Sequence, residues 1–341
     1  MQIELRTQVI EPRRRTFTNL AERFGDRPAS RYEEGTIDVQ ATENFHYRPL
    51  WGPTRWQYDP EYSALRLTDP YSFTDPRQLY YAPYVQSRSS MQEAFSKSLD
   101  YLESRSLLGR MPEAWQQLVA NVLLPLRHYE AGAQLITTEG VRFCYGTTID
   151  ACCTFAAFDR IGNAQQLSRV GIVLSGGSAE LLGAAKQAWL EAPALQGLRR
   201  LEEELLTERD WGTELVTLDL ADRLVYGLMY QFLDEAALLG GAGAYSLIAQ
   251  HLNTWFADQR RWIDALIATW LADPEVADAN RAALDAVLAA RWGQVVEAVS
   301  DLAAAVDAHV GVGAVDAARS NAAAVAAGLT ALGLTVPEVS A

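Results

Sequence analysis

Glutamate and histidine side chains three residues apart could bind iron, and the chain contains one such pair. In helical bundles, a carboxylate-bridged di-iron site takes one Glu from each of two helices and a Glu-x-x-His pair from each of two others. The chain has four histidines, and no carboxylate stands three residues before His128, His251 or His309. Glu43 and His46 match the spacing, but they lie in a proline-rich segment and have no second copy. The sequence therefore predicts no metal site in this chain.

Motifs for nucleophilic, zinc-dependent or phosphate chemistry are missing as well. The sequence has no G-x-S-x-G, H-E-x-x-H, P-loop or G-x-G-x-x-G pattern. The glycine-containing stretches 175–178 and 240–245 favour corners between helices, because no strand precedes either of them. Cys144, Cys152 and Cys153 form no spaced pair, which favours small buried thiols in a reducing cytoplasm. On motifs alone, the chain is a helical protein without a catalytic site.

Composition limits the class of protein and its partners. The chain has 341 residues, 49% of them hydrophobic, which is enough for a large core. Its formal net charge of -14 would repel a phosphate backbone, so nucleic-acid binding is not expected. The N-terminus has no apolar signal region, and no stretch of about 18 uninterrupted apolar residues occurs. We therefore expect a cytoplasmic protein that does not enter the membrane.

Residues 1–85 are expected to form an extended arm. They hold eight of the thirteen prolines and show no helical or strand period. They are also rich in aromatic residues, which argues against disorder. These aromatic side chains must be buried against something, either a partner subunit or the helical body of the same chain, and composition favours neither.

Helical periodicity begins near residue 86, and we expect a helical bundle over 86–310 followed by a helical tail over 311–341. The expected helices span about 86–102, 112–135, 141–174, 178–191, 194–209, 213–239, 243–271 and 276–310. Turn and capping residues, such as Gly176-Gly177 and Asp273-Pro274, separate them. Several helices exceed twenty residues, which predicts a large all-α bundle.

Distinctive blocks of residues recur along the chain. They lie at 22–26 (ERFGD), 28–32 (PASRY), 44–51 (NFHYRPLW), 74–81 (TDPRQLYY), 125–128, 167–169, 196–200 and 209–211. These blocks resemble the β subunit, which is small and non-catalytic, of the hydroxylase of bacterial multicomponent phenol hydroxylases. That family belongs to the soluble di-iron monooxygenases. The resemblance implies an all-α, ferritin-like long-helix bundle with an irregular N-terminal arm and additional C-terminal helices.

The resemblance also implies where metal ligands are missing. Arg160 and Asn163 stand where the catalytic α subunits have the Glu and the His of one pair, and Gln259 and Trp262 stand at the second pair. A cation at a ligand position would oppose iron binding by its charge and its volume. The remnants of the two single-carboxylate positions would be Glu130 and either Asp234 or Glu235.

By resemblance, the chain is a structural subunit of an NADH-dependent monooxygenase that hydroxylates phenol or a related aromatic with O2. The chain alone would be non-catalytic and bind no cofactor. The di-iron site would lie on the α subunit, and FAD and a 2Fe-2S cluster on a reductase. The hydroxylase would be an α2β2γ2 assembly that also meets a regulatory protein. The arm would supply the interface residues Phe45, His46, Tyr47, Arg48, Trp51, Tyr80 and Tyr81.

Three other interpretations stay open at this point. The first is a β subunit of a related alkane, alkene or toluene monooxygenase, because substrate choice would be decided in the α subunit. The second is a free-standing helical adaptor protein unrelated to oxygenases. The third is that the chain is itself an enzyme with an unrecognised site.

Overall fold

The computed structural model describes residues 16–41, 46–50, 52 and 54–338, and within these ranges it contains helices and no strands. The α-helices are α1 (Thr18–Phe24), α2 (Arg31–Thr36), α3 (Tyr81–Ser104), α4 (Glu113–Leu118), α5 (Leu126–Phe143), α6 (Thr147–Leu174), α7 (Glu180–Glu191), α8 (Pro193–Leu205), α9 (Trp211–Tyr226), α10 (Leu233–Leu239), α11 (Gly243–Leu271), α12 (Ala277–Val310) and α13 (Ala314–Ala331). Short turns of 3-10 helix lie at η1 (Pro60–Tyr62), η2 (Pro70–Ser72) and η3 (Leu108–Arg110). The π-helical turns are η4 (Val119–Leu123) and η5 (Gly227–Phe232).

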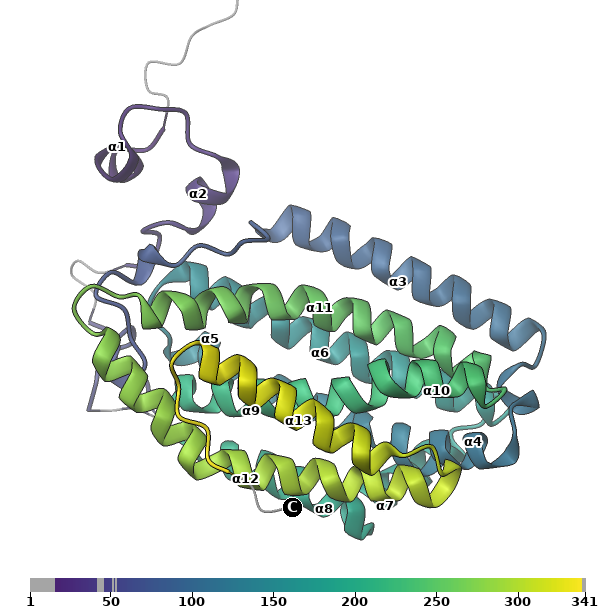
Figure 1. The fold of residues 1–341 in the computed structure, drawn as a ribbon. Coiled ribbons are helices and arrows are strands. Elements are labelled where there is room, and N and C mark those ends of the chain that lie inside the picture. Colours follow the sequence, from purple (N-terminus) through teal and green to yellow (C-terminus); the bar gives the residue numbers. More distant parts are fainter. Residues whose placement is uncertain (1–15, 42–45, 51, 53, 339–341) are drawn as a thin grey trace, which may run out of the picture.

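The long helices run side by side in one bundle, with α3 along one edge and α12 along the opposite edge (Figure 1). The helices α5 and α6 pack against each other along their length, and α9 and α11 complete the centre. The C-terminal helices α12 and α13 cover α8 and α9. The expected all-α, ferritin-like bundle with additional C-terminal helices is confirmed. No helix in the described part of the chain is long and apolar enough to cross a membrane.

Helix α6 is unusual because polar side chains are buried along it. A helix with one buried face has polar residues only on the opposite face. In α6, Asp159, Arg160, Asn163 and Gln166 are all buried together with apolar neighbours. Burial of such groups is costly unless they find partners, so the buried polar side chains of α6 mark a candidate site.

One predicted helix, over 141–174, was wrong. Two helices occupy this stretch, because α5 ends at Phe143 and α6 begins at Thr147. Between them, Gly146 has φ 109°, which only glycine adopts without strain. A Cβ at Gly146 would also lie 3.0 Å from the carbonyl oxygen of Pro70, so the turn is packed tightly against the arm.

Other boundaries also differ from the sequence prediction. The helix expected over 112–135 is divided by η4 and by Pro125, and the helix over 213–239 contains the π-helical turn η5. Helix α3 begins at Tyr81, inside the segment that we assigned to the arm. The arm itself contains α1 and α2, and α2 starts with a capping box between Ser30 and Glu33.

The last part of the arm packs on the bundle of the same chain. Leu65, Leu67 and Phe73 belong to the main hydrophobic core. The backbone of this segment is also hydrogen-bonded to the bundle. The side chain of Asn280 accepts from the N–H of Arg66 at 3.0 Å and donates to the carbonyl of Arg66 at 2.8 Å. Residues 63–77 therefore form part of the bundle surface.

The packing of α8 on α12 predicts opposite effects of alanine at two helical glycines. A Cβ at Gly197 would lie 2.9 Å from the Cα of Ala298, whereas a Cβ at Gly183 in α7 would have no neighbour within 4 Å. We expect Gly197→Ala to lower the free energy of unfolding by about 1–3 kcal/mol, because α8 and α12 must separate. Gly183→Ala should raise it by up to about 1 kcal/mol, because alanine favours the helix. Urea unfolding of both variants measures these changes. Equal changes in the free energy of unfolding would contradict the close packing of α8 on α12.

Candidate functional site

A buried ion-pair cluster lies at the centre of the bundle, around the side chain of Arg160. The side chain of Arg160 is fully buried, and its guanidinium donates to Glu130 Oε2 at 3.1 Å and to Asp222 Oδ2. Glu130 comes from α5, Arg160 from α6 and Asp222 from α9, so the cluster ties together three helices. The ring of Trp255 on α11 lies 4.8 Å from the guanidinium carbon and adds a cation–π contact.

Neighbouring hydroxyl and amide groups complete this Arg160 cluster. Tyr129 donates to Asp222 Oδ1 at 2.7 Å, and Tyr226 donates to Glu130 Oε1 at 2.5 Å. The amide of Asn163 donates to Glu130 at 3.4 Å and to Tyr226 at 3.2 Å. Both carboxylates therefore accept several hydrogen bonds, as buried charges require.

Burial dominates the electrostatics of the cluster. Desolvation raises the pKa of Asp222 to about 6, although the neighbouring Arg160 charge opposes this shift. Desolvation also raises the pKa of Glu202, which approaches the cluster from α8, well above its usual value. For Arg160, burial opposes the charged form, but Asp222 and Glu130 outweigh it and raise the pKa. The guanidinium thus stays charged between the two carboxylates.

The residues of the cluster do not fit a di-iron site. The cation of Arg160 occupies the space between the two carboxylates and bonds to both of them. An iron ion there would have to displace the guanidinium, which already neutralises Glu130 and Asp222. In the described part of the chain, no group of three or more His, Cys, Asp or Glu side chains could hold a metal ion. No reaction step through iron follows for this chain.

The second predicted pair lies on α11 and forms a contact of its own. Gln259 and Trp262 are both buried, and the indole of Trp262 donates to Gln259 Oε1 at 2.9 Å. This hydrogen bond occupies the side chains that would stand at the Glu and His positions. The structure does not bring them into the hydrogen-bond network of Arg160.

The second carboxylate of the cluster, Asp222, was not among the predicted residues. Asp222 lies beside Arg160, whereas Asp234 accepts a hydrogen bond from Ser246 and Glu235 is only half-buried. The signal in the sequence is the spacing of Asp222 and Tyr226, four residues apart, which places both on one face of α9. Asp234 and Glu235, the residues that the resemblance implied, lie on α10.

The predicted interface residues lie away from the Arg160 cluster. Phe45 and Trp51, together with Glu43, lie outside the described residues. His46, Tyr47 and Arg48 are exposed on the arm, where the guanidinium of Arg48 lies 4.0 Å from the centre of the Trp56 ring. Tyr80 is half-buried, and Tyr81 is 75% exposed at the start of α3.

Comparison with known proteins identifies the family. Residues 51–274 match the family model described as methane, phenol and alkene hydroxylase. The chain belongs to this family. It is 39% identical over 321 residues to the phenol 2-monooxygenase oxygenase component DmpL of Pseudomonas sp. (strain CF600), an alignment that covers 94% of this chain and 95% of that protein. The resemblance to the phenol hydroxylases is thereby confirmed.

Solved structures agree with the assignment to the family. A xenon-pressurized phenol hydroxylase from Pseudomonas sp. OX1 superimposes with a TM-score of 0.89 at 32% identity, covering 98% of this chain and 100% of that chain. A more distant relative is the β subunit of the hydroxylase component of the toluene-4-monooxygenase system of Ectopseudomonas mendocina. It is 24% identical over 279 residues, covering 76% of this chain and 82% of that protein.

A buried carboxyl outside the Arg160 cluster predicts a measurable pH dependence. Glu214 in α9 is 2% exposed, its Oε2 has no hydrogen-bond partner among the described residues, and burial raises its pKa to about 9. The folded chain keeps this proton while the unfolded chain releases it near pH 4.5. The titration of Glu214 therefore lowers the free energy of unfolding as the pH rises from about 4.5 to about 9.

Glu214→Gln should remove this contribution. We expect the variant to be more stable than the wild type by about 1–3 kcal/mol near pH 8 and to match it near pH 4.5. Chemical denaturation at several pH values measures the difference. The exposed Glu297→Gln serves as a control that should keep the pH dependence of the wild type. A Glu214→Gln profile parallel to that of the wild type would contradict the assignment.

Proposed function

We propose that the chain is the structural β subunit of the oxygenase component of a multicomponent monooxygenase that hydroxylates phenol or a related aromatic. One observation carries the structural role: Arg160 fills the space between Glu130 and Asp222 with a positive charge. The family and the similarity to phenol monooxygenase oxygenase components support the reaction. The name of the relative from toluene-4-monooxygenase supports the β designation.

In this proposal, other subunits carry the chemistry. The di-iron site lies on an α subunit, and electrons from NADH arrive through a reductase that holds FAD and a 2Fe-2S cluster. The α, β and γ subunits form an α2β2γ2 assembly. The role of this chain is to support the α subunit, with the exposed aromatic residues of the arm, such as Tyr47 and Tyr81, as contact points. Aromatic residues of this kind are enriched at subunit interfaces.

Reconstitution tests this function. The α and γ subunits are expressed with the full chain, without it, or with a chain that lacks residues 1–50, and phenol hydroxylation is measured with the reductase and NADH. We expect activity only with the full chain, and loss of co-purification with the shortened chain while circular dichroism still shows its helices. Full activity without this chain would overturn the proposal. Stoichiometric assembly of the shortened chain would overturn the role of the arm.

A further inference from the structure

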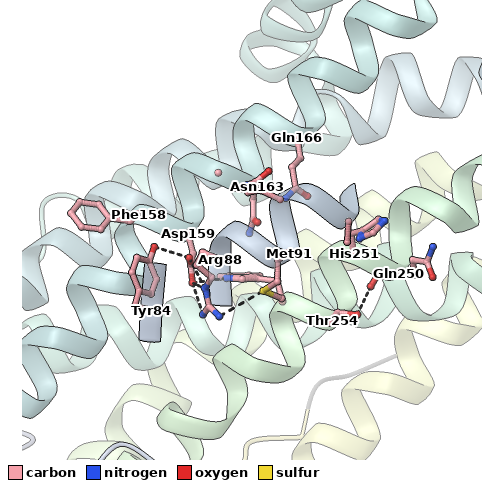
Figure 2. Close-up of a pocket in the computed structure, with 14 residues that line it drawn as sticks. Tyr84, Arg88, Met91, Phe158, Asp159, Asn163, Gln166, Gln250, His251 and Thr254 are labelled. Carbon is pink, nitrogen blue, oxygen red and sulfur yellow. Dashed lines mark hydrogen bonds and ion pairs between the residues drawn. The ribbon is translucent and has the colours of Figure 1, made fainter. Parts of the chain in front are cut away.

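A second feature of the bundle is a cavity of about 310 Å³ that opens to solvent between α3, α6 and α11 (Figure 2). Its walls include the aromatic side chains of Tyr84, Phe158 and Trp255 and the thioether of Met91. An apolar cavity of about 150 Å³ already holds benzene, so there is room here for a molecule with one ring. Aromatic and sulfur-containing walls favour such a ring through stacking and edge contacts.

The polar groups of the wall leave hydrogen-bond acceptors free. Gln166 is only 8% exposed, yet its Oε1 has no hydrogen-bond partner among the described residues. Asn163 uses both amide hydrogens on Glu130 and Tyr226, which leaves its carbonyl oxygen for another donor. Figure 2 shows Asn163 and Gln166 next to each other on α6, one helical turn apart. A buried acceptor without a donor is costly, so a ligand that donates here would gain affinity.

The charges around the cavity are already neutralised. Asp159 accepts from Tyr84, Arg88 and Trp255 at 2.9 Å each, and Arg88 also pairs with Asp258 at 2.8 Å. An anion would find no unpaired cation at this wall, and a cation would find no unpaired carboxylate. The chemistry therefore favours a neutral ligand that combines an aromatic ring with a hydroxyl donor.

We propose that this cavity binds a small neutral phenol on the present chain, with the ring against Met91 and Trp255 and the hydroxyl donating to Gln166. The ligand class follows from the walls, and only the expectation that phenol itself is the ligand in the cell rests on the proposed function. The site adjoins the Arg160 cluster, because Asn163 and Trp255 line the cavity and also contact Glu130 and Arg160.

Equilibrium dialysis of the full chain with phenol and with benzene tests the proposal. We expect saturable binding of both and tighter binding of phenol. Gln166→Leu should weaken the affinity for phenol about 2- to 12-fold, the range for a single hydrogen bond. It should leave the affinity for benzene unchanged. Gly162→Leu, which places a side chain in the cavity, should remove the binding of both. Gln187→Leu, at an exposed position on α7, is the matched control.

Thermal unfolding of each variant shows whether it is folded before its binding is interpreted. Absence of saturable phenol binding to the wild type would overturn the proposal, as would equal phenol affinity in folded Gln166→Leu. Phenol binding that survives in folded Gly162→Leu would place the ligand elsewhere and overturn it too. The assay uses this chain alone. Failure to assemble with other subunits would therefore refute the proposed function and leave this site intact. Absence of phenol binding would refute the site and leave the proposed function intact.

Discussion

Replacing Arg160 by methionine is expected to lower the free energy of unfolding by about 3–5 kcal/mol, because two buried carboxylates lose their cation. Methionine matches the length of the side chain, so most of the loss comes from charge and only a small part from packing. Urea unfolding at pH 7 measures the change. The control is Arg200→Met, whose exposed side chain pairs with Glu204 one turn away and whose loss should cost less than about 1 kcal/mol.

The same variant should respond to pH in a defined direction. Burial already raises the pKa of Asp222 to about 6 in the presence of Arg160, and loss of that cation raises it further. An acid whose pKa is raised on folding loses stability as the pH rises, so the penalty of Arg160→Met should shrink between pH 7 and pH 5. The combination with Glu130→Gln and Asp222→Asn should recover part of the stability at pH 7. A neutral effect of Arg160→Met would show that the ion pairs do not hold the helices together.

Replacing Asp159 by alanine is the second change with a large expected effect. Asp159 on α6 accepts from Tyr84 and Arg88 on α3 and from the indole of Trp255 on α11. Without it, three buried or half-buried donors lose their acceptor at once, and we expect a loss of about 3–5 kcal/mol. Thermal and urea unfolding measure it, together with faster amide exchange in α3.

A matched control uses an ion pair at the surface. Asp316 pairs with Arg319 on α13, and both side chains are mostly exposed. Asp316→Ala should therefore change stability by less than about 1 kcal/mol. If Asp159→Ala were no more destabilising than Asp316→Ala, α3 would be held by its apolar contacts and not by this carboxylate.

The sequence contains most of the information on the helices and little on their irregularities. The 3.6-residue period and breakers such as Gly176-Gly177 predict the long helices, because core burial and turn chemistry both depend on local residues. The turn at Gly146 was missed because the apolar residues on both sides continue the helical pattern across it. The π-helical turn η5, inside the helix expected over 213–239, leaves no such pattern, since tertiary contacts select it.

The site was only half predictable for a related reason. Arg160 and Asn163 could be placed through the resemblance, because they stand three residues apart on one helix where the α subunits have Glu and His. Glu130 was named with them as a carboxylate remnant, but Asp222 was not, because it lies 62 residues from Arg160 on another helix and only the fold brings the two together. A missing ligand can be recognised from a local pattern, but the side chains that replace its interactions depend on how the helices pack.

The most direct test of the structural role is the iron content and size of two preparations. One contains this chain alone, and the other contains the chain co-expressed with the proposed α subunit. We predict a folded, helical, iron-free chain by itself and iron only in the larger complex, because Arg160 occupies the space between Glu130 and Asp222. Near-stoichiometric iron in the isolated chain would contradict it.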